Sequence, residues 1–495
     1  MIATILMCAA LALPAVEAPN FHAGNAELGQ YLTEASEKNP DLKAKFLEWH
    51  AMLERVPQVT SLEDPMLTYT QFVESDQRKY GLRLEQKFPW FGTLRARGDK
   101  AVAEADAALS RFYASRNEVF ASVKRAYFEY WALGEDVKIT EEQATVLGNV
   151  EELVKSRYGL GLATQSELFR VEIEKDKLED MRKGLEQSRG SLSARLAAAL
   201  GRDAGGDDMP WPQAAEFPSA LPPEKEVLQA VRAANPGVAS LQHMMESWDK
   251  EVVLAKKKGY PDFSVEVGYD DMKDMKSYDR RMNTALAVDS IKMFAQEAPT
   301  GVLPALGDVA YGAGKDLYLR TPGDVRDDVM VSLKVSLPIW RSRIQAGIRE
   351  ARLMKESVQH DKHRLELALE SGAKEAMFGI QDAQRRYALY KESLITKEFK
   401  SYESLLSEYG AQVDTESGTA SASSAGFVDI QESMKALLEF QLEQVRAARD
   451  WQVAAADLEM IMGGPWKSAE VSTGMEGTGA QAEKPVEAAP VAPQK

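Results

Sequence analysis

The chain has 495 residues, a net charge of −16 and a single cysteine, Cys8, near its start. The acidic balance, without a basic cluster that interleaves with aromatics, argues against nucleic acid as a partner. Five histidines, with no glycine-rich phosphate loop and no nucleophile motif, offer little from which to build an active site. We therefore predict neither an enzyme nor a bound cofactor.

Residues 1–18 are predicted to be a secretory signal peptide. The apolar run Ile2–Val16 is too short for a membrane-spanning helix, and it leads into a small-x-small pattern at Val16-Glu17-Ala18. No later segment has 18 continuous apolar residues, so helices are not expected to cross a membrane.

The first half of the chain predicts helices around one strand pair. Helix is expected over 26–56, and strands over about 64–73 and 80–89. From Thr93 to Tyr158 no proline occurs, and apolar residues keep the alternating three-four spacing of a coiled coil. A tip hairpin over about 158–167 then leads into a helix from Gln165 to Leu200. The stripe comprises Val102, Ala105, Leu109, Phe112, Val119, Val123, Ala126, Tyr130, Leu133 and Val137.

The second half repeats this order after a Gly/Pro-rich linker, 203–223. Helix is expected over 224–258, and strands over about 261–270 and 328–338 on either side of a loop, 271–327. A long helix from Arg341 to Tyr409, a tip hairpin over about 409–429 and a helix from Val428 to Met462 follow. The Ser/Ala/Gly-rich run Asp414–Ala425 predicts a flexible insertion in this tip, and 468–495 has the composition of a disordered tail.

Matching landmarks show that the chain is a duplication. Asn39-Pro40 precedes Pro65 by 25 residues, and Asn235-Pro236 precedes Pro261 by the same distance. Glu167-Leu168 and Asp429-Ile430 each precede a helix-ending glycine, Gly201 or Gly463, by 34 residues. A shared order with shared spacings indicates two copies of one unit, 19–202 and 224–467.

Three of the four predicted strands alternate between apolar and polar residues, whereas Met66 to Val73 alternates poorly. Phe263, Val265, Val267 and Tyr269, for example, are separated by polar residues and one glycine. For any single hairpin this pattern favours half-buried strands of a soluble sheet, and it also fits strands that face lipid on one side and a lumen on the other. Four strands cannot close a barrel alone, so the second reading requires several chains.

The repeated landmarks resemble the TolC-like outer-membrane efflux protein family over residues 26–463. The resemblance rests on the two Asn-Pro helices, the strand pairs that end in Phe88-Pro89-Trp90-Phe91-Gly92 and Leu337-Pro338-Ile339-Trp340, the long helices, and Arg157-Tyr158-Gly159-Leu160-Gly161 before Glu167-Leu168. The Phe88–Gly92 motif further resembles the heavy-metal or cation efflux branch of that family.

The resemblance implies a mainly α fold with a small β part, formed by long coiled-coil helices and four antiparallel strands. Three chains would form a homotrimer whose strands close a 12-stranded β-barrel in the outer membrane, above a periplasmic tunnel of helices. The implied function is a passive exit duct in outer-membrane lipid. An inner-membrane pump and a periplasmic adaptor (membrane fusion) protein would deliver the cargo, a metal cation or an organic compound.

The resemblance also assigns roles to individual residues. The adaptor-docking tips would be Tyr158, Gly161, Glu167, Leu168, Tyr409, Gly426, Asp429 and Ile430. Acids near the tips are candidates for a cation-selective constriction, namely Asp414, Glu416 and Glu432 with Glu167 and Asp429. The membrane-interface aromatics would be Trp90, Phe91 and Trp340.

No metal site is predicted, although two weak candidates exist. His360 and His363 are one helical turn apart, but their charged neighbours indicate a solvated helix face. Met272, Met275 and Met282 offer thioether ligands for Cu(I), although methionine in a loop more often has no such role.

An alternative function remains open at this stage. The chain could be a non-membrane periplasmic coiled-coil adaptor or scaffold whose strands form a small soluble domain. Two hairpins, each with its own strand pair, favour the duct.

Overall fold

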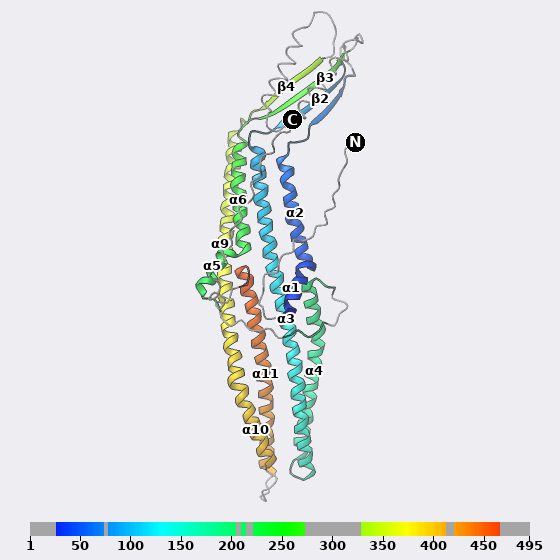
Figure 1. The fold of residues 1–495 in the computed structure, drawn as a ribbon, viewed down its shortest axis with the longest axis vertical. Coiled ribbons are helices and arrows are strands. Elements are labelled where there is room, and N and C mark those ends of the chain that lie inside the picture. The colour runs from blue at the N-terminus through cyan, green and yellow to red at the C-terminus, as the bar shows by residue number, and fades with distance from the viewer. Residues whose placement is uncertain are drawn as a thin grey trace, which may run out of the picture. The chain divides into compact units, whose positions relative to one another are not determined.

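The computed structural model describes residues 26–73, 78–203, 209–213, 221–272, 328–411 and 420–465, which form long helices and one sheet (Figure 1). The predicted signal peptide and tail, and the candidates Met275, Met282, Asp414 and Glu416, lie outside these ranges. Among the described residues, no helix combines the length and apolar character needed to cross a bilayer. The helices are α1 (Ala26–Lys38), α2 (Pro40–Thr60), α3 (Thr93–Gly159), α4 (Gln165–Leu200), α5 (Glu224–Ala234), α6 (Pro236–Lys257), α9 (Arg341–Ala388), the π-helix η1 (Leu389–Leu394), α10 (Ile395–Ala411) and α11 (Ala420–Met462).

The chain divides into two compact units. The hairpin unit comprises the residues up to Leu42, Ser115–Asn235 and those from Leu367 onward. The sheet unit comprises Lys43–Ala114 and Pro236–Glu366. Each unit takes residues from both sequence repeats, so neither repeat is a domain by itself.

The sheet unit holds four strands: β1 (Met66–Gln71), β2 (Arg78–Phe88), β3 (Asp262–Met272) and β4 (Asp328–Ser336). Their order is β1-β2-β3-β4, and every neighbouring pair is antiparallel. The predicted fold class, long helices with four antiparallel strands, is confirmed. β1 and β4 are the two edges of this sheet (Figure 1).

Each Asn-Pro pair breaks a helix that the sequence analysis treats as one. The predicted helix over 26–56 is two helices, α1 and α2, and the one over 224–258 is α5 and α6. A proline disfavours helical backbone at the residue before it, and Asn235 accordingly has an extended ψ of 120°. Pro40 and Pro236 then begin the second helix, where their missing N–H costs nothing.

The two asparagines make the same contact in both repeats. Asn39 Nδ2 donates to the carbonyl of Ala199 at 3.0 Å, and Asn235 Nδ2 donates to that of Ile461 at 2.8 Å. Both carbonyls belong to the last turn of a helix, which would otherwise leave them without partners. The duplication seen in the sequence is therefore also a duplication of contacts.

The two long helical stretches differ in continuity. α3 runs without interruption from Thr93 to Gly159, whereas the second stretch contains η1 between α9 and α10. The sequence predicts one continuous helix there, which is wrong in this detail. Tyr409 comes 71 positions after Pro338, whereas Tyr158 comes 69 positions after Pro89. A π turn accommodates an extra residue without ending the helix.

Two further details correct the sequence analysis. Val102, placed in the coiled-coil stripe, is 45% exposed. α11 begins at Ala420 rather than Val428, so residues 420–425 of the predicted flexible run are helical. Alanines at 420, 422 and 425 have high helix propensity, which explains the longer helix.

The core of the hairpin unit lies between its helices. Near the tips, Leu147, Val150 and Val154 of α3 pack in one cluster with side chains of α4, α10 and α11, which we call the tip core cluster. A second cluster joins α5, α9 and α11. Apolar packing thus holds the α3/α4 hairpin to the α10/α11 hairpin.

Candidate functional site

One face of the sheet is apolar. Cross-strand partners align Leu67, Leu84, Val267 and Val331 in one row across all four strands. A second row aligns Phe88, Phe263 and Val335. Several of these side chains are open to solvent in the single chain, with Leu67 at 68% and Val335 at 44% exposure. Exposed apolar rows of this kind indicate a face that meets lipid or another protein.

The opposite face carries a network of ion pairs. Lys334 Nζ lies 2.9 Å from Glu85 and 2.6 Å from Glu266. Arg83 Nε lies 3.9 Å from Glu266. Because the strands alternate, the charges gather on one side of the sheet and the apolar residues on the other. Such a division matches the lumen and lipid faces of a barrel strand.

Gly81 and Asp270 show how closely this charged face is packed. A Cβ atom at position 81 would lie 2.3 Å from Asp270 Oδ1, so a larger residue would require this carboxylate to move. Arg78 Nη1 approaches the other oxygen of Asp270 at 3.2 Å.

The three predicted interface aromatics lie where strands join helices. Phe91 and Trp340 are 59% and 70% exposed. The Trp90 ring instead stacks on Tyr260, with centroids 5.1 Å apart, and on Phe263 at 5.7 Å. Trp90 therefore links the β2 end to the β3 start, while the other two project outward.

The first predicted tip is a tight turn between α3 and α4. Gly161 has φ +73°, a conformation that favours glycine. Thr164 caps α4, because its Oγ1 accepts from the Glu167 N–H at 3.3 Å and donates to Glu167 Oε1 at 3.1 Å. Tyr158 and Leu160 are 46% and 66% exposed, while Leu168 packs against the tip core cluster.

A buried polar group joins the two hairpins at their tips. The Tyr409 hydroxyl donates to Glu167 Oε2 at 2.8 Å, and Arg157 Nη1 donates to the Tyr409 carbonyl. The Arg157 guanidinium also lies 4.1 Å from the centre of the Tyr409 ring. All three side chains are buried, and burial, with the Glu167 hydrogen bond, raises the pKa of Tyr409. We call Arg157, Glu167 and Tyr409 the tip latch.

Sequence reasoning selected Glu167 and Tyr409 separately but missed Arg157 as their partner. Arg157 stands directly before Tyr158 in the quoted motif, and a charged residue in a coiled-coil helix ordinarily faces solvent. The sequence contains no signal that this guanidinium turns inward.

The second tip is described as far as Ala411 of α10 and again from Ala420 of α11. Ile430 is fully buried in the tip core cluster, and Gly426 lies near the Tyr409 ring. Asp429 and Glu432 are exposed on α11. Their role as pore-lining acids stays a prediction, as does that of Asp414 and Glu416.

The two histidine candidates are not part of a metal-binding cluster in the described part of the chain. His360 and His363 are exposed on α9, and the nearest carboxylate to His363 is Glu366, 3.9 Å away. Within the described ranges, no group of three or more His, Cys, Asp or Glu residues is arranged to hold a metal ion. Met272 ends β3.

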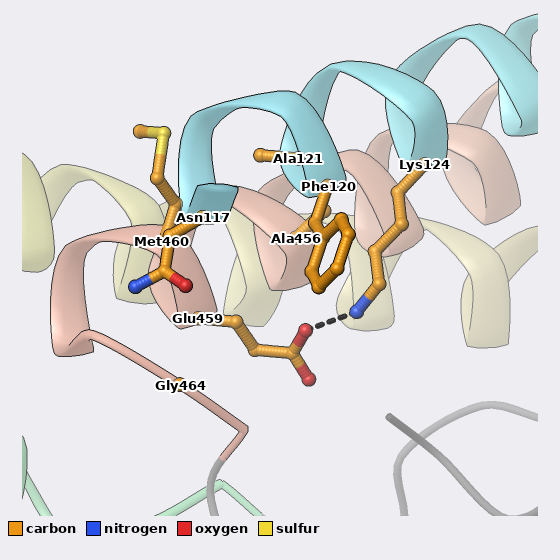
Figure 2. Close-up of a pocket in the computed structure, with 8 residues that line it drawn as sticks. All are labelled: Asn117, Phe120, Ala121, Lys124, Ala456, Glu459, Met460 and Gly464. Carbon is orange, nitrogen blue, oxygen red and sulfur yellow. Dashed lines mark hydrogen bonds and ion pairs between the residues drawn. The ribbon is translucent and has the colours of Figure 1, made fainter. Parts of the chain in front are cut away.

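A small pocket between α3 and α11 is lined by a buried ion pair (Figure 2). Lys124 of α3 pairs with Glu459 of α11, and their side chains are only 4% and 3% exposed. Asn117 lines the same pocket, and its buried amide has no hydrogen-bond partner among the described residues. This pair, absent from the sequence predictions, joins the first repeat to the second.

Comparisons with known proteins relate the first repeat to one family by sequence and both repeats to solved structures by fold. Residues 32–202 match the family model of the outer membrane efflux proteins, which confirms the predicted resemblance and agrees with an outer-membrane location. No curated protein sequence matches the chain.

Solved structures extend the likeness over both repeats. CusC, described as forming a transmembrane channel, matches with a TM-score of 0.66 at 12% identity, over 90% of this chain and 93% of its own. A membrane protein from Pseudomonas aeruginosa matches with 0.66 at 14% identity, over 89% and 94%. The outer membrane protein VceC from Vibrio cholerae matches with 0.64 at 15% identity, over 90% and 97%. At these identities the matches establish the fold.

Proposed function

We propose that this protein is the outer-membrane exit duct of a tripartite efflux or secretion system. It conducts substrate passively, and an inner-membrane pump and a periplasmic adaptor deliver that substrate. The observation that carries the proposal is a four-stranded sheet with one exposed apolar face and one face of paired charges, in a chain that also bears two helix hairpins. Neither a soluble adaptor nor a scaffold needs an exposed apolar sheet face.

Closure of the barrel requires further copies of the chain. β1 and β4 are open edges, and open edges are not tolerated in lipid. The hairpin unit also leaves apolar stripes exposed: Leu367, Phe378 and Leu389 on α9 and η1, and Phe169 and Ile173 on α4. A homotrimer would pair the edges and cover the stripes.

The tip latch is the proposed resting lock of the tunnel. It ties α10 to the α3/α4 turn through one hydroxyl and one guanidinium, both shielded from water. Adaptor docking at Tyr158, Leu160 and the rest of the tips would separate the hairpins and break these bonds. Conduction then needs no chemical step.

Cell fractionation and bilayer recording test the proposal. The protein is expected in the outer membrane as a heat-modifiable trimer, and the purified trimer is expected to give discrete conductance steps. A soluble monomer, or a folded trimer without any conductance step, would contradict the duct.

A variant tests the latch separately. Tyr409→Phe keeps the ring over Arg157 but removes the hydroxyl that binds Glu167, so mean conductance of the resting channel should rise about tenfold, in keeping with loss of about 1.5 kcal/mol. Tyr158→Phe, at the same tip but exposed, is the control and should leave conductance unchanged. Equal conductance of wild type and Tyr409→Phe would exclude the latch as a lock.

A further inference from the structure

The joints between strands and helices carry basic side chains that form no ion pair with any described residue. They are Arg95 and Arg97 after β2, Lys256 before β3, and Arg341 and Arg343 after β4. We call these five residues the basic collar. No acidic residue occurs in the segments 86–98, 252–261 and 329–349, although the chain as a whole has a net charge of −16.

The collar residues differ in pairing from other bases of the sheet unit. Lys100 lies 2.9 Å from Glu251, and Lys355 lies 2.7 Å from Asp249. Among the described residues, no carboxylate lies within ion-pair distance of any collar residue. Arg95, Lys256, Arg341 and Arg343 are exposed, and Arg97 is half-buried.

Direct contacts bring the three joints together. Lys257 Nζ donates to the Phe91 carbonyl at 2.9 Å, which joins the end of α6 to the start of α3. Asp262 Oδ1 accepts from the Trp90 N–H at 3.0 Å. A Cβ atom at Gly259 would lie 3.6 Å from Ile344 Cγ2, so the start of α9 lies against the same turn. The collar is therefore one surface of one compact unit.

Exposed apolar residues lie immediately on the strand side of the collar. Leu337, Ile339 and Trp340 are 72%, 69% and 70% exposed, and Arg341 follows them directly. Phe91 precedes Arg95 in the same way. Going from strand to helix, each of these joints changes from apolar to cationic within a few residues.

From this order we propose that the basic collar binds the phosphate groups of anionic phospholipids in the leaflet that borders the helices. Aromatic side chains favour the depth of the headgroups, and cations just outside that depth are attracted to anionic lipid. Guanidinium groups bind phosphate oxygens in a bidentate geometry, which suits the four arginines of the collar. The inference rests on the proposed function, since it requires the sheet to lie in a membrane.

A collar variant tests the proposal in the full-length protein. Arg95→Gln, Lys256→Gln, Arg341→Gln and Arg343→Gln remove four charges together. The control removes four exposed bases of the hairpin unit: Arg170→Gln, Lys225→Gln, Lys397→Gln and Lys400→Gln. Brominated phosphatidylglycerol or phosphatidylcholine is titrated into the purified oligomer in micelles, and quenching of tryptophan fluorescence reports lipid beside Trp90 and Trp340.

We expect wild type and control to prefer phosphatidylglycerol, and the collar variant to lose about tenfold or more of that preference. The preference should weaken as salt is added. Arg341→Lys with Arg343→Lys keeps the charge and should retain most of the preference, which separates charge loss from misfolding.

An unchanged preference in the collar variant would overturn the proposal, and this is also the result expected if an acidic protein binds the collar instead. Failure of the wild type to insert into vesicles of either lipid would contradict the duct itself. Insertion without any lipid preference would contradict the binding of anionic lipid by the collar, but not the duct.

Discussion

Two glycines show how single residues hold the hairpin unit together. Gly201 and Gly463 have φ of +78° and +88°, and each ends a helix against an Asn-Pro joint. A Cβ atom at Gly201 would lie 2.9 Å from Asn39 Cα, and one at Gly463 would lie 2.5 Å from the Ala234 carbonyl oxygen. Both neighbours are backbone and cannot move aside without shifting a helix.

Gly201→Ala and Gly463→Ala should therefore each destabilise the protein by about 3 kcal/mol, through backbone strain and through the contact. Gly161→Ala is the matched control, because Gly161 has φ +73° but nothing within 4 Å of its Cβ position. It should cost about 1 kcal/mol. Thermal unfolding in detergent measures all three, and equal losses at 161 and 201 would show that the backbone contact has no effect.

Asp136 of α3 is half-buried, and one of its carboxyl oxygens, Oδ1, is shielded from solvent. Its Oδ1 has no hydrogen-bond partner among the described residues. Burial raises its pKa to about 6, although Arg446 and Arg449 oppose the shift. The folded state therefore holds this proton more tightly than the unfolded chain does, and stability falls as pH rises from about 4 to 6.

Asp136→Asn resembles the protonated form at every pH. It should raise stability by about 1 to 2 kcal/mol at neutral pH and have little effect near pH 4. Thermal unfolding of both proteins across this range is the measurement. A stabilisation that does not vary with pH would show that the carboxyl charge is not its cause.

At the scale of elements, the duplication produces two versions of each helix, and buried charge distinguishes them. Lys124 of α3 corresponds to Ala373 of α9, 249 residues later, and Glu459 of α11 corresponds to Ala197 of α4, 262 residues earlier. All four positions are buried. Only the pairing of α3 with α11 brings the lysine and the carboxylate together, so the pair favours this arrangement over others that the repeated apolar pattern permits.

Lys124→Met removes the ammonium group that Glu459 contacts, and it should cost about 3 to 5 kcal/mol. The double variant Lys124→Met with Glu459→Met replaces both charges by apolar groups and should recover most of this loss. A double variant as unstable as the single one would show that packing, rather than charge, explains the effect. Thermal unfolding of the three proteins makes the comparison.

At the scale of the whole molecule, exposed apolar residues on α9 and η1 are consistent with the proposed trimer. Leu367, Phe378 and Leu389 are 54%, 69% and 42% exposed, and they follow one another at 11-residue intervals. Eleven residues are close to three helical turns, so the three side chains lie on one face. A soluble monomer rarely exposes such a stripe.

Phe378→Glu should therefore weaken the proposed trimer by about 3 kcal/mol, because it places a charge where apolar packing is expected. The trimer fraction on a native gel or by light scattering gives the measurement. Gln229→Glu, an exposed position on α5 that adds the same charge, is the control. Equal trimer fractions in both variants would place the interface elsewhere.

The sequence by itself determined the duplication, the fold class and, for three of the four strands, the residues of each sheet face. These properties are periodic: alternation with period two, helical spacing and repeated Asn-Pro and Gly landmarks are all local patterns along the chain. Only the tertiary structure decided the tip latch, the Lys124–Glu459 pair, the π turn and the collar. The latch, the ion pair and the collar each bring together residues more than 80 positions apart, and the π turn is a small change of helical phase. Such features leave no local pattern in the sequence.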